Sequence, residues 1–372
     1  MIYLDNAATT LQKPKSVGES VLKAMSECGN AGRSGHRAAL RSAEVLYNCR
    51  EKICRLFGQD NPEQVVFTQN TTHALNLAIK GMMQDGGHCV ISGYEHNSVV
   101  RPLYAMRHQG VTYSAVQTPL FEPEFFLEAF EKAITPQTVC AVCTHISNAF
   151  GYILPIAEID QICNQHGIPL IIDAAQSAGN FPWNKNELRA VVAICAPGHK
   201  GLYGPQGTGF LVCRDGFRGK CLLQGGTGSR SSRFEQPEFL PDQLEAGTQN
   251  IHGIAGLSAG IEYVMRRGEM EIFQHEQELI SYAIQELQKM KRFRVFFGEQ
   301  QGGVLAFVDD SISADTIAEY LGEHEVAVRG GLHCASLAHQ TVGTRDGCVR
   351  ISVSDFNSFK EIEVLCECLK KL

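Results

Sequence analysis

Short runs of apolar and β-branched residues recur along residues 1–251, and helical or glycine-rich sequence separates each run from the next. Several runs are apolar at every position, which is typical of strands in a parallel sheet covered by helices on both faces. A helix is expected over Ser42–Phe57, because apolar residues recur there at helical spacing up to Gly58. The pattern predicts an α/β domain built on a doubly wound, mostly parallel sheet. The expected strands are Gln64–Thr68, His88–Ser92, Thr112–Val116, Thr138–Thr144, Ile168–Ile172, Val191–Cys195 and Gly209–Cys213.

A second, smaller domain is expected over residues 252–372, because long helices alternate there with isolated strands in an α+β pattern. We place the boundary between a large domain, 1–251, and this small domain. The segment Gln224–Gln249 is rich in Gly, Ser and Arg and is expected to be a long functional loop. The expected helices of the small domain are His252–Arg267, Ile272–Met290, Ala314–Glu323 and Ser358–Lys371, and its strands lie near Gly303–Val308, Val326–Arg329 and Cys348–Val353.

Charge and hydropathy exclude several classes of partner. The 372 residues carry a net charge of -7 without a block of like charges, so neither nucleic acid nor an anionic membrane is an expected partner. No apolar run is long enough to span a membrane. The first residues, MIYLDNAATT, lack the basic and apolar regions of a signal peptide. A cytoplasmic location is therefore expected.

The 14 cysteines are scattered singly, which is typical of small buried side chains in a reducing compartment. Cys140 and Cys143 lie close to His145, but their run reads as a strand, so the two thiols should point to opposite faces. No second Cys/His pair with zinc-site spacing completes a set of four ligands. We expect no metal site.

Polar residues follow two neighbouring strands of the predicted sheet. Asp173 ends one buried run with Gln176 shortly after it, and His199 and Lys200 follow another inside a glycine-rich turn. Taken singly, the Asp could be a helix cap and the Lys a solvated loop residue. Together, a carboxylate and an amine at adjacent strand ends suit a pyridine cofactor: the carboxylate keeps the ring nitrogen protonated and the amine forms a Schiff base.

With these motifs the sequence resembles the class V aminotransferase family of fold-type I enzymes, which use pyridoxal 5′-phosphate (PLP). The resemblance spans the chain in order, through YLDNAATT, FTQNTTHALN, EHNSVV, THISNAFG, the Asp173 and Lys200 motifs, EAGTQN and VAVRGGLHCA. The last motif resembles the sulfur-accepting loop of cysteine desulfurases, a group that includes selenocysteine lyases. The resemblance as a whole implies a large domain with a mostly parallel seven-stranded sheet and a small domain that carries the catalytic cysteine, Cys334.

The resemblance assigns the cofactor residues. Lys200 would carry PLP and move the Cα proton, Asp173 would pair with the pyridine nitrogen, and His96 would stack on the ring. Thr248 would reach the phosphate of a neighbouring subunit, which implies a homodimer. His96 could instead only cap a loop, and Thr71 and Thr72, which the resemblance places at the phosphate, could be ordinary helix caps. The full cofactor set is Lys200, Asp173, Gln176, His96, Thr71, Thr72, His199 and Thr248.

The same resemblance assigns the substrate side. Asn148 and Arg350 would hold the substrate carboxylate, Arg350 as a bidentate clamp, although a mid-strand Arg is as often an edge-strand charge. Arg329 and His36 would line the substrate side. The catalytic set is Lys200, Cys334 and His96, and Arg329 and His333 are expected to favour the Cys334 thiolate.

Two positions depart from the family pattern. Pro197 replaces a hydroxyl residue that contacts the phosphate, which predicts weaker cofactor binding, and Leu332 replaces a His of the catalytic loop. The predicted reaction converts L-cysteine to L-alanine and leaves a persulfide on Cys334, for transfer to an acceptor protein or thiol. Selenocysteine lyase, another class V aminotransferase or a kynureninase-like hydrolase remain alternatives, as does a non-enzymatic sulfur-relay protein that keeps PLP only structurally.

Overall fold

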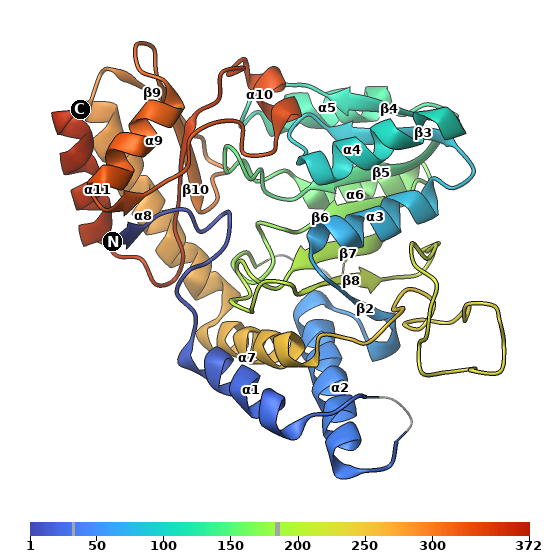
Figure 1. Cartoon of the computed structure of the whole chain (residues 1–372). Coiled ribbons are helices and arrows are strands. Elements are labelled where there is room, and N and C mark those ends of the chain that lie inside the picture. Colours follow the sequence, from blue (N-terminus) through green and yellow to red (C-terminus); the bar gives the residue numbers. More distant parts are fainter. Residues whose placement is uncertain (32–33, 183–186) are drawn as a thin grey trace.

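The computed structural model describes residues 1–31, 34–182 and 187–372. A seven-stranded sheet in the order β2-β8-β7-β6-β5-β3-β4 forms the centre of the large domain (Figure 1). β8 runs opposite to the other six strands of this sheet, which are parallel to one another, so the predicted mostly parallel α/β architecture is confirmed. The strands are β2 (Val65–Thr68), β3 (Gly87–Ser92), β4 (Val111–Val116), β5 (Thr138–Thr144), β6 (Leu170–Asp173), β7 (Val191–Pro197) and β8 (Gly209–Cys213).

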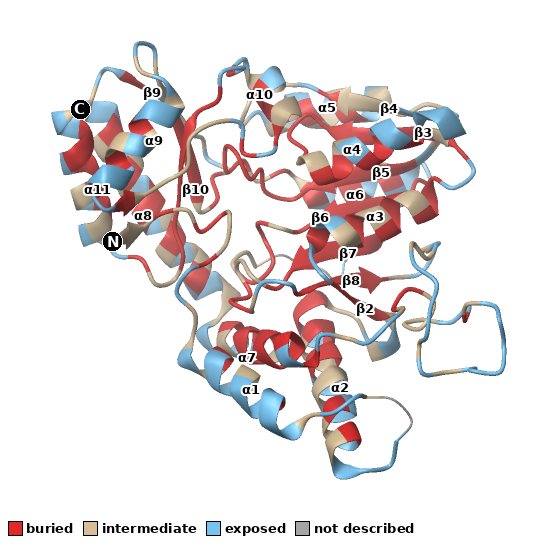
Figure 2. Ribbon diagram, in the orientation of Figure 1, coloured by how far each residue is buried: buried red, intermediate tan, exposed pale blue. Residues whose placement is uncertain are grey.

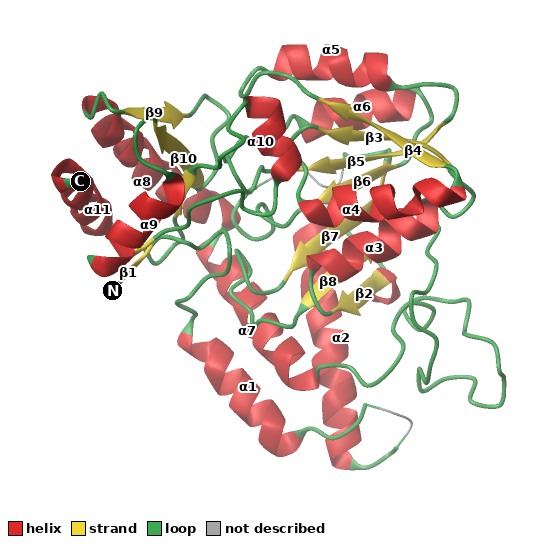
Figure 3. Cartoon of the chain, turned by 45° about the horizontal axis from the view of Figure 1, so that its top comes forward, coloured by secondary structure: helices red, strands yellow, loops and turns green. Residues whose placement is uncertain are grey.

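Helices cover both faces of this sheet (Figure 3). Side chains of α3 and α4 pack with Cys140 on one face, and side chains of α2, α5, α6 and α7 pack with Cys143 on the other. The two thiols therefore point to opposite faces, as expected. The helices are α1 (Lys15–Glu27), α2 (Arg37–Phe57), α3 (Thr71–Met82), α4 (Asn97–Ala105), α5 (Pro123–Ala133), α6 (Ile156–Gln165) and α7 (Ile251–Arg267), with 3₁₀ helices at Pro62–Gln64 and Met106–Gln109.

Helix α2 illustrates why these residues form these elements. His36 caps its first turn by accepting the Ala39 N–H, so the helix begins at Arg37, earlier than the apolar pattern predicted. It ends at Gly58, which adopts the left-handed conformation that glycine tolerates.

The small domain has a three-stranded antiparallel sheet in the order β12-β10-β9, packed against three helices around a separate core. The predicted helices that correspond to α8, α9 and α11 and the strands β10 to β12 are confirmed, whereas β9 and the short α10 were not predicted. The helix predicted over His252–Arg267 is also present, as α7, and its side chains join the core of the large-domain sheet. No described helix is long and apolar enough to cross a membrane. The elements are α8 (Glu269–Lys289), β9 (Phe293–Phe296), β10 (Val304–Asp309), α9 (Ala314–Glu323), β11 (Val326–Ala327), α10 (Ser336–Val342), β12 (Val349–Ser352) and α11 (Phe359–Lys371).

The N-terminal segment joins the small domain before it reaches the large one. Strand β1 (Ile2–Tyr3) pairs in parallel with β11, and the segment then runs on to the loop after β7, where the Thr10 N–H donates to the His199 carbonyl. Figure 1 shows this blue segment between the two lobes. The division at residue 251 stays a prediction, and residues 2–10 contact both sides of it.

The segment Gln224–Gln249 contains no helix or strand and extends from the large domain, as a long loop should (Figure 2). Most of it is exposed, but Glu245 is buried. Glu245 pairs with Arg50 of α2 at 2.7 Å and accepts the Phe67 N–H of β2 at 2.6 Å. These contacts fix the C-terminal end of the loop against the sheet.

Candidate active site

The carboxyl ends of the parallel strands meet at one edge of the sheet, where ligands bind in open α/β folds. A cavity at this edge collects eight of the predicted site residues. They come from the ends of β2, β3, β5, β6 and β7 or from the segments that follow them. Of these strands, β7, β6, β5 and β3 are neighbours in the sheet, and β8 separates β2 from them. The eight are Thr71, Thr72, His96, Asn148, Asp173, Gln176, His199 and Lys200, and Asn70, Ser98, Thr144, Ile146 and Ala175 complete the lining.

Asp173 and Lys200 enter this cavity from neighbouring strands. Asp173 is the last residue of β6 and accepts the Ala175 N–H at 2.9 Å, so it also makes the local contact of a capping residue. Burial raises the pKa of Asp173 to about 6, against the opposing effects of that hydrogen bond and of Lys200. Burial lowers the pKa of Lys200 to about 8, and the charge of Asp173 opposes the shift. The cavity thus brings together an acid and an amine that titrate close to neutrality.

His96 caps α4 and lines the cavity, so both interpretations of this residue hold. Its Nδ1 accepts the Ser98 N–H at 3.0 Å and lies 2.8 Å from the Ser98 hydroxyl, which fixes the ring. Burial, followed by the charge of Lys200, lowers the pKa of His96 to about 4. The imidazole is therefore neutral at physiological pH.

Glu95, which the sequence analysis did not single out, lies buried beside this site. Its Oε1 is 2.5 Å from the Ser92 hydroxyl and accepts the Thr144 N–H at 2.7 Å, so it ties β3 to β5. Burial raises the pKa of Glu95 to about 8, and Asp173 adds to the shift. Its position directly before His96 was the one sequence signal that could have identified it.

The N-terminus of α3 supplies hydrogen-bond donors to the same cavity. Asn70 caps the helix by accepting the His73 N–H. Among the described residues the buried Thr71 hydroxyl has no hydrogen-bond partner, while the Thr72 hydroxyl lies 2.7 Å from that of Ser98. Free amides and a free hydroxyl at a helix N-terminus form an arrangement that binds anions. His199 also lines this cavity, with Nδ1 3.0 Å from the Thr9 hydroxyl.

The Cys334 loop is held next to this cavity by backbone contacts. The Cys334 carbonyl accepts the Asn97 N–H of α4 at 2.8 Å, and the Asn148 side chain donates to the His333 carbonyl at 2.8 Å. His333 and Cys334 both adopt positive φ, 52° and 56°, a strained conformation typical of functional sites. Of the cysteines in the described ranges, Cys334 alone is exposed.

The expectation that His333 helps to favour the thiolate needs correction. Its imidazole is buried, and Nε2 lies 3.0 Å from the Cys348 carbonyl. Burial, followed by the charge of Arg350, lowers the pKa of His333 to about 2. His333 is therefore neutral and supplies no positive charge to the thiol.

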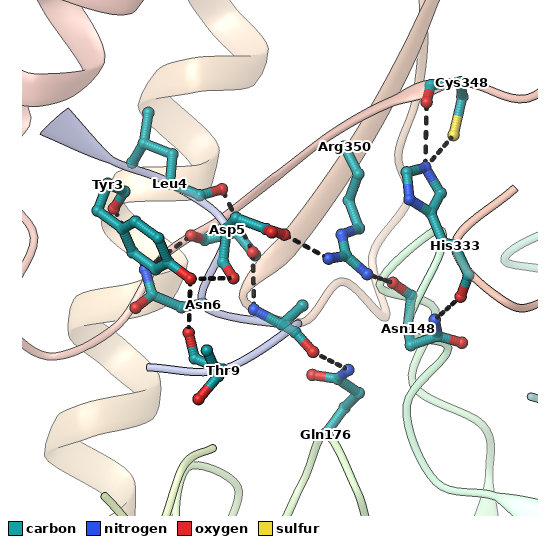
Figure 4. Close-up of polar contacts among 12 residues, drawn as sticks. Tyr3, Leu4, Asp5, Asn6, Thr9, Asn148, Gln176, His333, Cys348 and Arg350 are labelled. Atoms are coloured by element: carbon teal, nitrogen blue, oxygen red, sulfur yellow. Dashed lines mark hydrogen bonds and ion pairs between the residues drawn. The ribbon is translucent and has the colours of Figure 1, made fainter. Parts of the chain in front are cut away.

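Arg350 is almost completely buried and lies beside Asn148, the other residue predicted to hold the substrate carboxylate. Its Nη1 donates to the Asn148 carbonyl at 2.9 Å, and its Nη2 lies 2.5 Å from Asp5 Oδ1 (Figure 4). Arg329 is adjacent, because its backbone N–H and carbonyl both pair with the backbone of Arg350. Asp5 was not among the predicted site residues.

Five predicted residues do not line the cavity of Lys200: Cys334, Arg350, Arg329, Thr248 and His36. Arg350 contacts Asn148, which does line it, and Arg329 pairs with Arg350. Thr248 is exposed at the end of the 224–249 loop, and His36 is exposed at the start of α2. Within a single chain neither lines the cavity. Pro197 is the last residue of β7 and pairs with Gly209.

One group of side chains has metal-ligand composition. The ligand atoms of the buried His333, His339 and Cys348 lie within 4.8 Å of one another. Arg350 acts on both His333 and Cys348 as a nearby positive charge. A divalent cation would be repelled by that charge in a buried position. That the chain binds no metal stays a prediction.

Comparison with known proteins identifies the class. Residues 2–365 match the class-V aminotransferase family model, and the chain belongs to this family. A probable cysteine desulfurase from Methanothermobacter thermautotrophicus is 32% identical over 387 residues, which cover 100% of this chain and 94% of that relative.

Solved structures agree with the sequence comparison. The apo structure of a cysteine desulfurase from Thermococcus onnurineus matches with a TM-score of 0.91 at 29% identity, covering 100% of this chain and 94% of that one. The Escherichia coli cysteine desulfurase CsdA, in its S-sulfonic acid form, matches with a TM-score of 0.88 at 26% identity, covering 99% and 94%. The predicted fold of fold-type I PLP enzymes is thus confirmed.

Proposed function

We propose that this protein is a PLP-dependent cysteine desulfurase that converts L-cysteine to L-alanine and leaves a persulfide on Cys334. One observation carries the proposal: the single exposed cysteine of the described chain lies on a loop fixed by Asn97 and Asn148. Asn148 itself lines the cavity of Asp173 and Lys200. A class V aminotransferase or hydrolase of another kind has no use for a thiol in that place.

The residues of the cavity fit PLP. The unpartnered Thr71 hydroxyl and the N-terminus of α3 suit the phosphate, with Thr72 and His199 close by. Asp173 suits the pyridine nitrogen, Gln176 the ring hydroxyl, and Lys200 the covalent attachment. The neutral imidazole of His96 suits stacking on the pyridine ring of PLP, because burying an uncharged imidazole costs less free energy of desolvation than burying a charged one. When bound, PLP supplies an electron sink for negative charge at the substrate Cα.

The chain's own residues then have distinct tasks. Arg350 and Asn148 orient the substrate carboxylate, with Arg329 and His36 on the substrate side. Lys200 moves the proton at Cα, for which an amine with a pKa of about 8 is well matched to neutral pH. The Cys334 thiolate attacks the substrate sulfur: a sulfur–sulfur bond forms, the carbon–sulfur bond breaks, and its electron pair remains on carbon, which is protonated to give alanine.

The proposal extends to partners. Thr248 and His36 are exposed and lie away from the cavity in their own chain, which supports a homodimer in which each subunit completes the other's site. The persulfide sulfur passes to an acceptor protein or small thiol, and the proposed location is the cytoplasm. Selenocysteine is the second candidate substrate, since the same residues serve a carbon–selenium bond.

The test measures alanine release from L-cysteine and from L-selenocysteine by the purified, PLP-loaded protein, with mass spectrometry of the Cys334 peptide. A mass increase of one sulfur on that peptide after exposure to cysteine is expected. Alanine release from selenocysteine alone would assign the lyase instead. Turnover of neither substrate, or sulfur on another cysteine, would overturn the proposal.

A further inference from the structure

The guanidinium of Arg350 already holds a carboxylate that belongs to its own chain. Asp5 Oδ1 lies 2.5 Å from Nη2, and the Asn148 carbonyl lies 2.9 Å from Nη1. The Arg350 side chain is only 1% exposed, while that of Asp5 is 20% exposed. Among the described residues no side chain or backbone atom bonds to the buried Nε of Arg350. In this structure the guanidinium of Arg350 is therefore buried and its charge is neutralised by Asp5, so a substrate carboxylate cannot bind to it without changing this pair.

The charges around this pair are unequal. Arg329 and Lys200 place positive charge near Arg350, and Asp5 is the acidic residue that acts on Arg350 most strongly. A substrate carboxylate that joined the pair would add a second negative charge next to Asp5. Like charges at hydrogen-bond distance in a buried site are unfavourable. Exchange of one carboxylate for the other avoids that repulsion.

The backbone on both sides of Asp5 is fixed. The Leu4 N–H donates to the Ala327 carbonyl at 2.9 Å, and the Ala7 N–H donates to the Ser352 hydroxyl at 2.8 Å. The Asn6 side chain bonds to Asn357 at 3.0 Å (Figure 4 shows Asn6 beside Asp5). Release of Arg350 thus needs only rotation of the partly exposed Asp5 side chain, without movement of the segment.

We propose that Asp5 occupies the substrate-carboxylate subsite on Arg350, and that the substrate carboxylate displaces it on binding. Asp5 acts as a specificity-determining residue, because ligands without a carboxylate cannot replace it on the buried guanidinium. This inference rests on the proposed role of Arg350 in holding the substrate carboxylate.

The test measures binding of propionate to the PLP-loaded protein by calorimetry, because propionate carries the carboxylate of the substrate and no amine. Asp5→Asn keeps the size of the side chain but removes the competing charge, so the Kd for propionate should fall about 3- to 10-fold. Propionamide, which has no charge, should bind no more tightly to the variant than to wild type. Asp5→Ala, which lacks the competing group altogether, should change propionate binding in the same direction.

Asp309→Asn is the matched control, since Asp309 forms an ion pair with Arg292 at 2.5 Å in the small domain without lining the cavity. This control should leave the Kd for propionate unchanged. An unchanged or higher Kd in both Asp5 variants would overturn the inference and indicate that Asp5 instead holds Arg350 in place for the substrate.

Arg350→Gln separates this inference from the proposed function. If Arg350 holds the carboxylate, Arg350→Gln weakens propionate binding at least tenfold, and adding Asp5→Asn to it causes no further change. If Arg350→Gln leaves propionate binding intact, the assignment of Arg350 fails and the inference fails with it. If Arg350→Gln weakens binding but Asp5→Asn does not strengthen it, the assignment stands and the inference alone fails.

Discussion

Asp173 and Lys200 line one cavity from adjacent strands, and each carries a pKa that burial moves toward neutrality. Burial raises the pKa of Asp173 and lowers the pKa of Lys200. Each shift is partly reversed, because the charge of each residue stabilises the charged form of the other. The pair therefore determines how much free amine is present at physiological pH.

Competitive labelling of the cofactor-free protein with acetic anhydride should give Lys200 a pKa of about 8, below the ordinary value of a lysine amine. Labelling of Lys200 should rise between pH 7 and 9 and level off above the pKa, because only the neutral amine reacts. Asp173→Asn should lower the pKa of Lys200 further, since the carboxylate favours the ammonium form. A Lys200 that labels with the ordinary lysine pKa of about 10.4 would contradict the assignment.

Asp173→Asn should also impair turnover of the PLP-loaded protein. The change keeps the size of the side chain and removes the charge proposed to hold the pyridine nitrogen protonated, so a loss of about 10²-fold or more in kcat is expected. The measurement is alanine release from cysteine. Asp160→Asn is the control, because the buried Asp160 accepts backbone N–H groups of residues 189–191 and does not line the cavity. Near-normal turnover by Asp173→Asn would mean that another carboxylate serves the ring.

Cys334→Ala should retain PLP absorbance near ~420 nm but release almost no alanine from cysteine, because the sulfur then has no acceptor. Turnover of selenocysteine should be affected less, since selenium leaves more readily. Cys221→Ala, which removes a half-buried thiol of the large domain, is the control and should behave like wild type. Full cysteine turnover by Cys334→Ala would refute the catalytic role of this thiol.

Glu245→Gln should destabilise the protein strongly although it lies outside the cavity. The change leaves the buried Arg50 without its partner, which costs about 3–5 kcal/mol in comparable buried pairs. The measurement is the midpoint of urea unfolding. The exposed pair of Lys132 and Glu128 is the comparison: Lys132→Gln should not shift the midpoint. Equal, small effects of both changes would show that the Arg50 pair contributes little.

Mixed dimers test whether subunits share sites. Lys200→Ala and Thr248→Ala each impair every site of their own homodimer if Thr248 serves the neighbouring subunit. A mixed dimer then contains one site with both native residues, so mixing the variants under exchange conditions should restore part of the activity. Gel filtration should show a dimer. No recovery in verified mixed dimers, or a fully active monomer, would contradict shared sites.

The sequence predicted the central sheet well because its strands are buried on both faces. Every expected strand of the large domain is present, with shifts at the ends. The strand expected from Ile168 begins at Leu170, since the Ile168 N–H donates back to Cys163 and Pro169 has no N–H. Strand β9 escaped prediction because Arg294 alternates with apolar residues at the edge of a small sheet, where the apolar run is short.

The candidate site could be predicted where residues follow buried strands, as Asp173 and Lys200 do. Asp5 could not be predicted, because it follows a strand of only two residues and its partner Arg350 lies 345 positions away. The neutrality of His333 also could not be predicted, since it depends on burial and on the charge of Arg350. Periodicity predicts which residues are buried, but it does not predict which distant charges become neighbours.

The placement of residues 2–10 has a consequence for biosynthesis. Ile2 pairs with Val326, and Asn6 forms a hydrogen bond with Asn357. During translation, residues 2–10 therefore cannot form these contacts until residues near the other end of the chain have been synthesised. The nascent large domain can form its sheet before that point. Asp5, however, cannot pair with Arg350, and the Ala7 carbonyl that accepts from Gln176 is not held in place, until the small domain has left the ribosome. Ribosome-bound intermediates are thus expected to lack the finished site, which closes only after synthesis of the last strand.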